Sequence, residues 1–96
     1  MRPSDALRIH RERMRQLILE AGMTNPRVYG SVVRGEDHEE SDLDILVDRG
    51  KDTSLLTLVH VQIDLSKMTG VKVDLRTPGD IPPGFREKAL AEAVAL

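Results

Sequence analysis

Cysteine is absent from this sequence of 96 residues, and aromatic side chains and long apolar runs are scarce. The absence of cysteine excludes disulfides, thiolate zinc sites and thiol catalysis. With one tyrosine, one phenylalanine and no tryptophan, the chain offers no surface on which nucleic-acid bases could stack. No apolar run approaches the length of a membrane span, and the N-terminal residues lack the apolar segment of a signal peptide. We therefore expect a cytoplasmic protein that does not associate with membranes.

The charges of the chain nearly cancel, with 14 basic and 16 acidic residues and a formal net charge of −2. Such a chain has no bulk attraction to phosphate backbones or anionic membranes, so direct binding of nucleic acid is not expected. Hydrophobic residues make up 40% and charged residues 31%, which is typical of a globular protein. The length predicts one domain over residues 1–96.

Apolar periodicity, capping residues and turn residues predict helices alternating with strands. The predicted helices cover residues 4–21, 31–34, 54–68 and 85–94, with Ser4 as cap of the first and Thr53 or Ser54 as cap of the third. The predicted strands cover residues 27–29, 42–47 and 71–75, and the segment TPGDIPPG reads as a loop. This order indicates an α+β protein in which a small mixed sheet of about three strands packs against helices.

Asp42 and Asp44 lie two residues apart in the second predicted strand, so their side chains share one face with Cα atoms about 6.6 Å apart. Leu43 and Ile45 point to the opposite face and can pack in the core. Two neighbouring carboxylates repel each other, and a divalent cation relieves that repulsion. Taken alone, an aspartate pair of this spacing is common on surface strands and does not establish a metal site.

Asp74 supplies a third carboxylate, on the polar face of the next predicted strand. Because neighbouring strands lie only about 4.8 Å apart, Asp42, Asp44 and Asp74 can converge. Carboxylate ligands without cysteine or a spaced histidine cluster suit Mg²⁺ or Mn²⁺, which typically share their coordination with water and substrate phosphates. The predicted ligand set therefore indicates phosphoryl or nucleotidyl transfer.

Gly30 and Ser31 lie where the first predicted strand passes into the short helical turn. Small residues there allow backbone N–H groups to approach a phosphate, and Ser31 adds a hydroxyl donor; the alternative is a plain turn with a helix cap. Arg34 could reach a phosphate oxygen or a partner, or could be an exposed surface residue. Lys72 could do the same, or could form a cross-strand ion pair.

Together these residues resemble a known signature. The pair GS at 30–31, followed after ten residues by DLD at 42–44, is similar to the motif of the DNA polymerase beta-like nucleotidyltransferase superfamily. The pair RG at 34–35 lies where small prokaryotic members often have it, and Tyr29 and the segments SDLDILVD and VKVDL extend the likeness. The chain resembles minimal nucleotidyltransferase domains, the antitoxin halves of HEPN/MNT toxin–antitoxin pairs.

The resemblance implies the polymerase beta-like fold and a set of residue roles. Asp42 and Asp44 would bind two ions of Mg²⁺ or Mn²⁺, and Asp74 would bind one of them while helping to activate the attacking hydroxyl. The residues that bind the triphosphate of ATP would be Gly30, Ser31 and Arg34.

The resemblance further implies an antitoxin enzyme that transfers AMP from ATP to a hydroxyl, expected to be a tyrosine hydroxyl, of a cognate HEPN ribonuclease toxin in a hetero-oligomer. The alternative is a non-catalytic antitoxin that neutralises the toxin by binding and occlusion, with residual aspartates. Transfer to RNA or a small molecule is disfavoured by the near-neutral charge, the missing aromatic residues and the lack of an acceptor-binding domain.

Overall fold

A mixed sheet with the strand order β3-β2-β1-β4 forms the centre of the structure, a computed structural model that describes residues 1–96. Strand β2 pairs in parallel with β3 and antiparallel with β1, which pairs antiparallel with β4. The elements in chain order are α1 Pro3–Glu20, β1 Thr24–Tyr29, α2 Ser31–Arg34, β2 Leu43–Asp48, α3 Leu55–Thr69, β3 Val73–Arg76, a 3-10 turn Pro78–Asp80, α4 Pro83–Glu92 and β4 Val94–Ala95. The predicted α+β class with a mixed sheet is confirmed.

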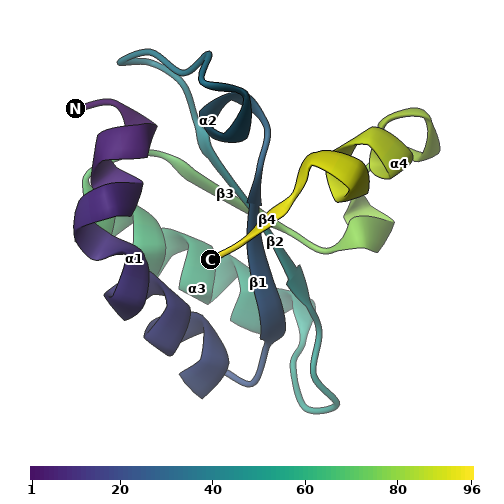
Figure 1. Cartoon of the computed structure of the whole chain (residues 1–96). Coiled ribbons are helices and arrows are strands. Elements are labelled where there is room, and N and C mark those ends of the chain that lie inside the picture. The colour runs from purple at the N-terminus through teal and green to yellow at the C-terminus, as the bar shows by residue number, and fades with distance from the viewer.

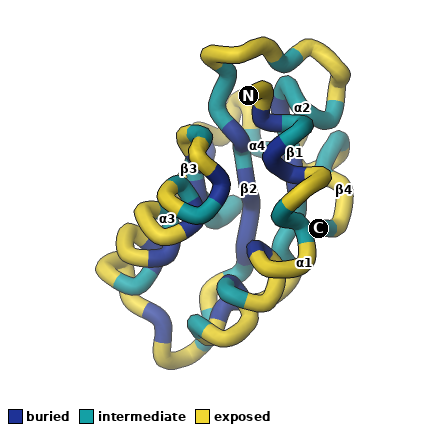
Figure 2. Tube along the Cα trace, turned by 90° about the vertical axis from the view of Figure 1, so that its left-hand side faces the viewer, coloured by how far each residue is buried: buried dark blue, intermediate teal, exposed yellow.

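Helices α1 and α3 cover one face of the sheet, and α4 lies on the other side (Figure 1). Alternation along the strands directs apolar side chains to the face covered by α1 and α3. Strand β2 runs through the interior between these layers (Figure 2). The main core consists of Leu7, Met14, Ile18, Met23, Val28, Leu43, Ile45, Val47, Leu58, Val61, Leu65, Val73 and Leu75.

A smaller apolar cluster lies on the opposite face of the sheet, beneath α4. It is formed by Leu46 of β2 with Ile81 and Ala89, and Tyr29 and Ala93 pack against it. Ala89 is the one buried residue of α4, so this helix covers part of the face and leaves the rest accessible. We call this second side of the sheet the open face.

Local signals in the sequence explain where α3 begins and ends. The hydroxyl of Ser54 accepts a hydrogen bond from the N–H of Thr57, and the Thr57 hydroxyl accepts one from the Ser54 N–H, which forms a capping box. Gly70 follows the helix with a positive φ of 75°, a left-handed conformation that favours glycine. Of the two predicted caps, Thr53 and Ser54, the structure has Ser54.

Several predicted element ends are wrong. The first three strands run over Thr24–Tyr29, Leu43–Asp48 and Val73–Arg76 rather than 27–29, 42–47 and 71–75, so Asp42 lies just before β2. Ser4 does not cap α1: the helix starts at Pro3 with Arg2 as N-cap, and the N–H of Ser4 donates instead to Asp37. The last helix ends at Glu92 rather than at residue 94, because Val94 and Ala95 pair with β1 as a fourth strand. None of the helices is both long enough and apolar enough to cross a membrane.

Candidate active site

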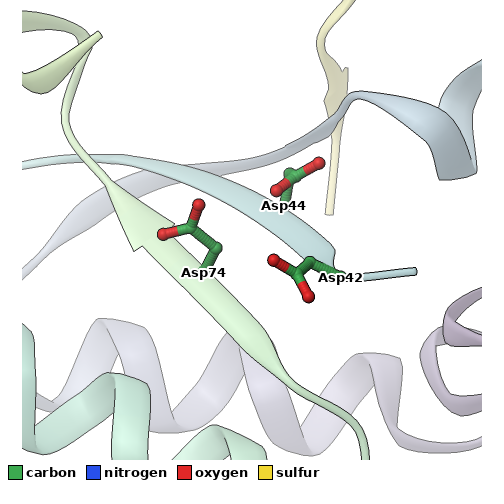
Figure 3. Close-up of side chains that lie close together, drawn as sticks. All are labelled: Asp42, Asp44 and Asp74. Carbon is green, nitrogen blue, oxygen red and sulfur yellow. The ribbon is translucent and has the colours of Figure 1, made fainter. Parts of the chain in front are cut away.

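Three carboxylates meet on the open face where β2 and β3 run side by side. Asp42 immediately precedes β2, and Asp44 on β2 is the register partner of Asp74 on β3. Figure 3 shows all three side chains directed into one space, and each offers an oxygen within 4.8 Å of the others. The predicted convergence of the three aspartates is therefore observed, and it follows from strand alternation combined with parallel pairing.

The Asp44 carboxyl is the most perturbed member of this triad. Partial burial, followed by the charges of Asp74 and Asp42, raises its pKa to about 6. Clustered carboxylates repel each other when ionised, and a divalent cation bound among them would remove the repulsion. Three oxygen donors at this separation, with no nitrogen or sulfur ligand among them, fit Mg²⁺ or Mn²⁺.

Two basic side chains flank the triad in different ways. The Nε of Arg76 lies 3.1 Å from the Asp74 Oδ2, and both residues are partly buried. The Nζ of Lys72, the residue before β3, lies 3.8 Å from the Oδ2 of Asp42, the residue before β2, and the lysine side chain is 79% exposed. Lys72 thus forms the cross-strand ion pair that the sequence left as one alternative, whereas Arg76 holds the Asp74 carboxylate in place.

Tyr29 lies beside the triad on the neighbouring strand. Its register partner across the β1–β2 pair is Asp44, and its ring packs against the small apolar cluster under α4. Burial, followed by the negative charge of Asp44 and Asp74, raises the pKa of the Tyr29 hydroxyl to about 12. The phenol is therefore neutral across the physiological pH range.

Gly30 follows Tyr29 and approaches the triad closely. Its φ of 81° and ψ of −151° are accessible to glycine but strained for other residues. A Cβ atom at this position would overlap the Asp44 Oδ2, so the approach itself requires glycine. Ser31 starts α2 directly afterwards, as predicted, and is partly exposed. The turn therefore brings the backbone of Gly30 and the hydroxyl-bearing residue Ser31 to the edge of the triad.

Arg34 is engaged in ion pairs within the protein. Its Nη1 donates to both carboxylate oxygens of Glu92 at 3.0 Å, and its Nε donates to Glu36 at 3.3 Å. The N–H of Gly30 donates to the same Glu92 carboxylate at 2.9 Å. Hydrogen bonds that the Arg34 side chain donates to Glu92 and Glu36 raise the pKa of Arg34. Arg34 and Gly30 are thus joined through a residue at the end of α4.

A cleft of about 390 Å³ opens between α4 and the open face. Gly30 and Arg34 lie at one part of its wall, and Arg76, which pairs with Asp74, lies at another. The aspartates themselves do not line it. The remaining lining residues are Tyr29, Ile81, Pro82, Phe85, Lys88, Ala89 and Glu92. The cleft therefore adjoins the triad and combines an apolar wall with three cationic side chains.

The acidic stretch before β2 has partly structural roles. The Asp37 carboxylate accepts the N–H of Ser4 and thereby anchors the loop to α1. Burial acts to raise the pKa of Asp37, but hydrogen bonding from Ser4 together with the positive charge of Arg2 outweighs it and lowers the pKa. Glu36 pairs with Arg34, and Glu39 and Glu40 are exposed.

Three residues near the triad were not singled out from the sequence as site residues. Alternation along the strands could have identified Arg76 and Tyr29. Arg76 lies two residues after Asp74 on the same strand face, and Tyr29 is the register partner of Asp44. Glu92 carries no such signal, because it reaches Gly30 from 62 residues away. Only the three-dimensional structure brings it to the site.

The fold and the acidic triad define a nucleotidyltransferase domain, and comparison with known proteins agrees. The family described as "Nucleotidyltransferase domain" matches residues 7–96, and the chain belongs to this family. Within it the chain is a minimal nucleotidyltransferase domain of the polymerase beta-like superfamily. The enzyme class and the family predicted from the sequence are thereby confirmed.

Individual relatives support the same assignment. The chain is 35% identical to the protein adenylyltransferase MntA of Thermococcus cleftensis over 88 residues. These aligned residues cover 92% of this chain and 86% of the relative. It is 38% identical over 78 residues to a candidate protein adenylyltransferase of Methanocaldococcus jannaschii, covering 81% of this chain and 84% of that protein. These relatives are similar to the chain over most of both lengths.

Solved structures match the architecture. A candidate minimal nucleotidyltransferase superposes with a TM-score of 0.85 at 38% identity and covers 97% of this chain and 95% of its own. A chain from a toxin–antitoxin structure with AMP-PNP superposes with a TM-score of 0.71 at 17% identity, covering 83% of this chain and 66% of its own. At that identity the second match shows a shared fold.

Proposed function

We propose that this chain is a metal-dependent protein adenylyltransferase that acts as an antitoxin. It transfers AMP from ATP to a tyrosine hydroxyl of a cognate HEPN ribonuclease toxin, with which it forms a hetero-oligomer. The observation that carries the proposal is the convergence of Asp42, Asp44 and Asp74 in a chain of the nucleotidyltransferase family. The similarity to the adenylyltransferase MntA and the fold shared with toxin–antitoxin chains support the acceptor class.

The aspartate triad provides the metal site of the proposed enzyme. Asp42, Asp44 and Asp74 would hold Mg²⁺ or Mn²⁺ through carboxylate oxygens that lie within 4.8 Å of one another. A bound divalent cation supplies positive charge that stabilises the negative charge developing on the phosphate oxygens. Although the pKa of the Asp44 carboxyl is raised, its value of about 6 still lies below neutral pH, so the group is largely ionised there and can bind a cation.

The proposed reaction joins the acceptor oxygen to the α-phosphorus of ATP and breaks the bond from that phosphorus to the bridging oxygen, so that pyrophosphate leaves. The acceptor hydroxyl loses its proton, and we assign Asp74 as the carboxylate that assists this loss. Arg76, 3.1 Å from Asp74 Oδ2, keeps the carboxylate oriented. The Gly30 N–H, the Ser31 hydroxyl and the Arg34 guanidinium are the donors assigned to the phosphate oxygens.

The test is to mix a substoichiometric amount of the protein with the product of its neighbouring gene, which we expect to be a HEPN-family protein, together with Mg²⁺ and ATP labelled at the α-phosphate. We expect label and a mass increment of one AMP on a tyrosine of the partner, found by intact mass and peptide mapping. The control is the Asp42→Asn/Asp44→Asn variant. Loss of the cation-binding carboxylates is expected to slow transfer by about a thousandfold or more.

Two outcomes would overturn the proposal. One is undiminished transfer by the Asp42→Asn/Asp44→Asn variant, which would remove the aspartates from the chemistry. The other is tight binding of the partner without label from any nucleoside triphosphate.

Occlusion is the second candidate function, and one surface favours it. The outer side of α3 carries apolar side chains that the rest of the chain does not cover. These exposed residues are Leu55, Leu56, Val59 and Ile63. An inhibitor that works by covering its target must be present at least one to one, whereas an enzyme protects the cell at a small fraction of the toxin concentration. Titration of toxin activity against antitoxin amount therefore separates the two functions.

A further inference from the structure

One carboxylate of the chain already occupies donors that the proposed function assigns to phosphate. Glu92, the last residue of α4, accepts the N–H of Gly30 through Oε1 at 2.9 Å. Both of its oxygens also accept from Nη1 of Arg34, each at 3.0 Å. The two donors thus converge on a single anionic group.

We propose that Gly30 and Arg34 form one oxyanion-binding site, which Glu92 fills in the nucleotide-free protein and which a phosphate group of the nucleotide takes by displacing Glu92. Glu92 is therefore an internal competitor of the nucleotide. The inference rests on the proposed function for the identity of the ligand as a nucleoside triphosphate.

The chemistry of the donors makes the two anions interchangeable. A carboxylate and a phosphate both present paired acceptor oxygens to a guanidinium group, which is the arrangement that arginine binds best. A single backbone N–H such as that of Gly30 makes one strong hydrogen bond at a time, so Glu92 and a phosphate oxygen exclude each other there. A phosphate group and the Glu92 carboxylate would also repel each other if both lay beside Gly30.

The position of the site relative to the triad is what a bound triphosphate requires. Gly30 lies so close to Asp44 that a Cβ atom would overlap the carboxylate oxygen, while its N–H points to Glu92. The same residue therefore borders the metal-binding carboxylates on one side and the oxyanion site on the other. We therefore expect a phosphate chain held at the triad to extend to the Gly30 N–H.

The contact that Glu92 makes is strong enough to form and weak enough to exchange. Burial acts to raise the pKa of Glu92, but hydrogen bonds from the Gly30 N–H and the Arg34 side chain outweigh it and lower the pKa. The carboxylate is therefore ionised at neutral pH. The side chains of Glu92 and Arg34 are 18% and 37% exposed, so solvent screens this ion pair in part.

After displacement, the Glu92 carboxylate has a second possible partner, Lys88. Lys88 lies one helical turn earlier on α4 and lines the same cleft. Side chains four residues apart on a helix can pair, so the displaced carboxylate can turn from Arg34 to Lys88 while the helix stays in place. We therefore expect the anion to exchange through a change of the Glu92 side-chain rotamer.

The experiment measures binding of ATP with Mg²⁺, and of inorganic tripolyphosphate with Mg²⁺, by titration calorimetry without an acceptor protein. Glu92→Gln keeps the size of the side chain and removes its charge, and we expect it to bind both ligands about tenfold more tightly than the original chain. Glu87→Gln, which removes an exposed charge from the same helix, is the matched control and should leave both affinities unchanged. The gain should disappear in Glu92→Gln combined with Arg34→Ala.

Unchanged or weaker binding by a folded Glu92→Gln variant would overturn the inference, because Glu92 would then serve only to hold the turn. Binding of neither ligand by the original chain would overturn it as well. If ATP binds as expected but no partner is labelled, the proposed function fails and this inference stands.

A second measurement uses the unaltered chain and does not depend on the variants folding. Amide nitrogen and proton shifts of Gly30, and the side-chain carboxyl carbon shift of Glu92, are followed by NMR while tripolyphosphate and Mg²⁺ are added. We expect both sets of signals to move together and to saturate at the same ligand concentration. A Gly30 shift without a Glu92 shift would show that phosphate leaves the carboxylate in place, contrary to the inference.

Discussion

The two faces of the sheet differ in the side chains that they bury and in how substitution of those side chains should change the free energy of unfolding. On the face covered by α1 and α3, β2 contributes Leu43, Ile45 and Val47, which are fully buried in an apolar core. On the open face, Asp42 and Asp44 are only partly buried. The main-chain positions alternate residue by residue, so adjacent residues of one strand belong to opposite faces.

Neighbouring residues of β2 therefore have different roles: those on the covered face pack in the core, and Asp44 on the open face belongs to the acidic triad. Apolar burial on the covered face is the main source of stability in a domain of this size. The ionised Asp44 carboxylate on the open face opposes folding when no cation is bound, because it is partly removed from water and lies beside Asp74 and Asp42. The free energy gained from apolar burial on the covered face therefore offsets the cost of the carboxylates that the open face needs for its proposed function.

The largest expected effect comes from truncating the covered face. Ile45→Ala removes a fully buried side chain from the core and should lower the free energy of unfolding by about 2–5 kcal/mol. Ile63→Ala, the same change at an exposed site on α3, is the matched control and should cost far less. Urea denaturation followed by circular dichroism measures both. Equal losses at the two sites would contradict the division of roles.

On the open face, removing the charge of Asp44 is expected to raise the free energy of unfolding. With the pKa of Asp44 raised to about 6 from an ordinary value near 4, the metal-free protein loses stability as pH rises through that window. Asp44→Asn cannot ionise and should be more stable than the original chain above pH 6, by on the order of 1–2 kcal/mol after allowance for solvent screening.

Thermal denaturation without metal at a series of pH values measures this difference. The advantage of Asp44→Asn should vanish below about pH 4, where both side chains are neutral. Asp64→Asn, an equivalent change at an exposed position of α3, should show no such pH dependence. A lower stability of Asp44→Asn at pH 7.5 without metal would mean that the carboxylate is structurally supported.

The smallest effect is expected at the rim of the triad. Lys72 pairs with Asp42 at 3.8 Å but is largely exposed, so Lys72→Ala should change the free energy of unfolding by less than about 0.5 kcal/mol. Lys51→Ala, at an exposed loop position, is the control for loss of a lysine. A change above 1 kcal/mol in urea denaturation, specific to Lys72, would mean that the rim contributes to folding after all.

The sequence was sufficient for the features that depend on local periodicity. Alternation along two strands placed Asp44 and Asp74 on equivalent faces, and their parallel pairing then brought the carboxylates together. The short turn 31–34 was predicted with its observed bounds, because Gly30 before it and Gly35 after it are unambiguous boundary residues. Roles of these residues in binding and catalysis remain predictions of the family resemblance.

The features that the sequence did not reveal depend on contacts between distant segments. Ser4 has the right chemistry for a cap, but Pro3 favours the first helical position and Asp37 takes the Ser4 N–H. Strand β4 is only two residues long and follows a helical pattern directly, so no periodicity could have separated it. Glu92 is one glutamate among many charged residues, and its partners lie in a turn 58–62 residues away.

Tyr29 gives the site its own optical signal. It is the only tyrosine, tryptophan is absent, and its register partner is Asp44. Because its pKa is raised to about 12, the phenol does not ionise at working pH, and its ultraviolet fluorescence reports on its surroundings alone. Events at the carboxylates can therefore be followed in unlabelled protein, and tryptophan in any associated chain can be excited separately at longer wavelength.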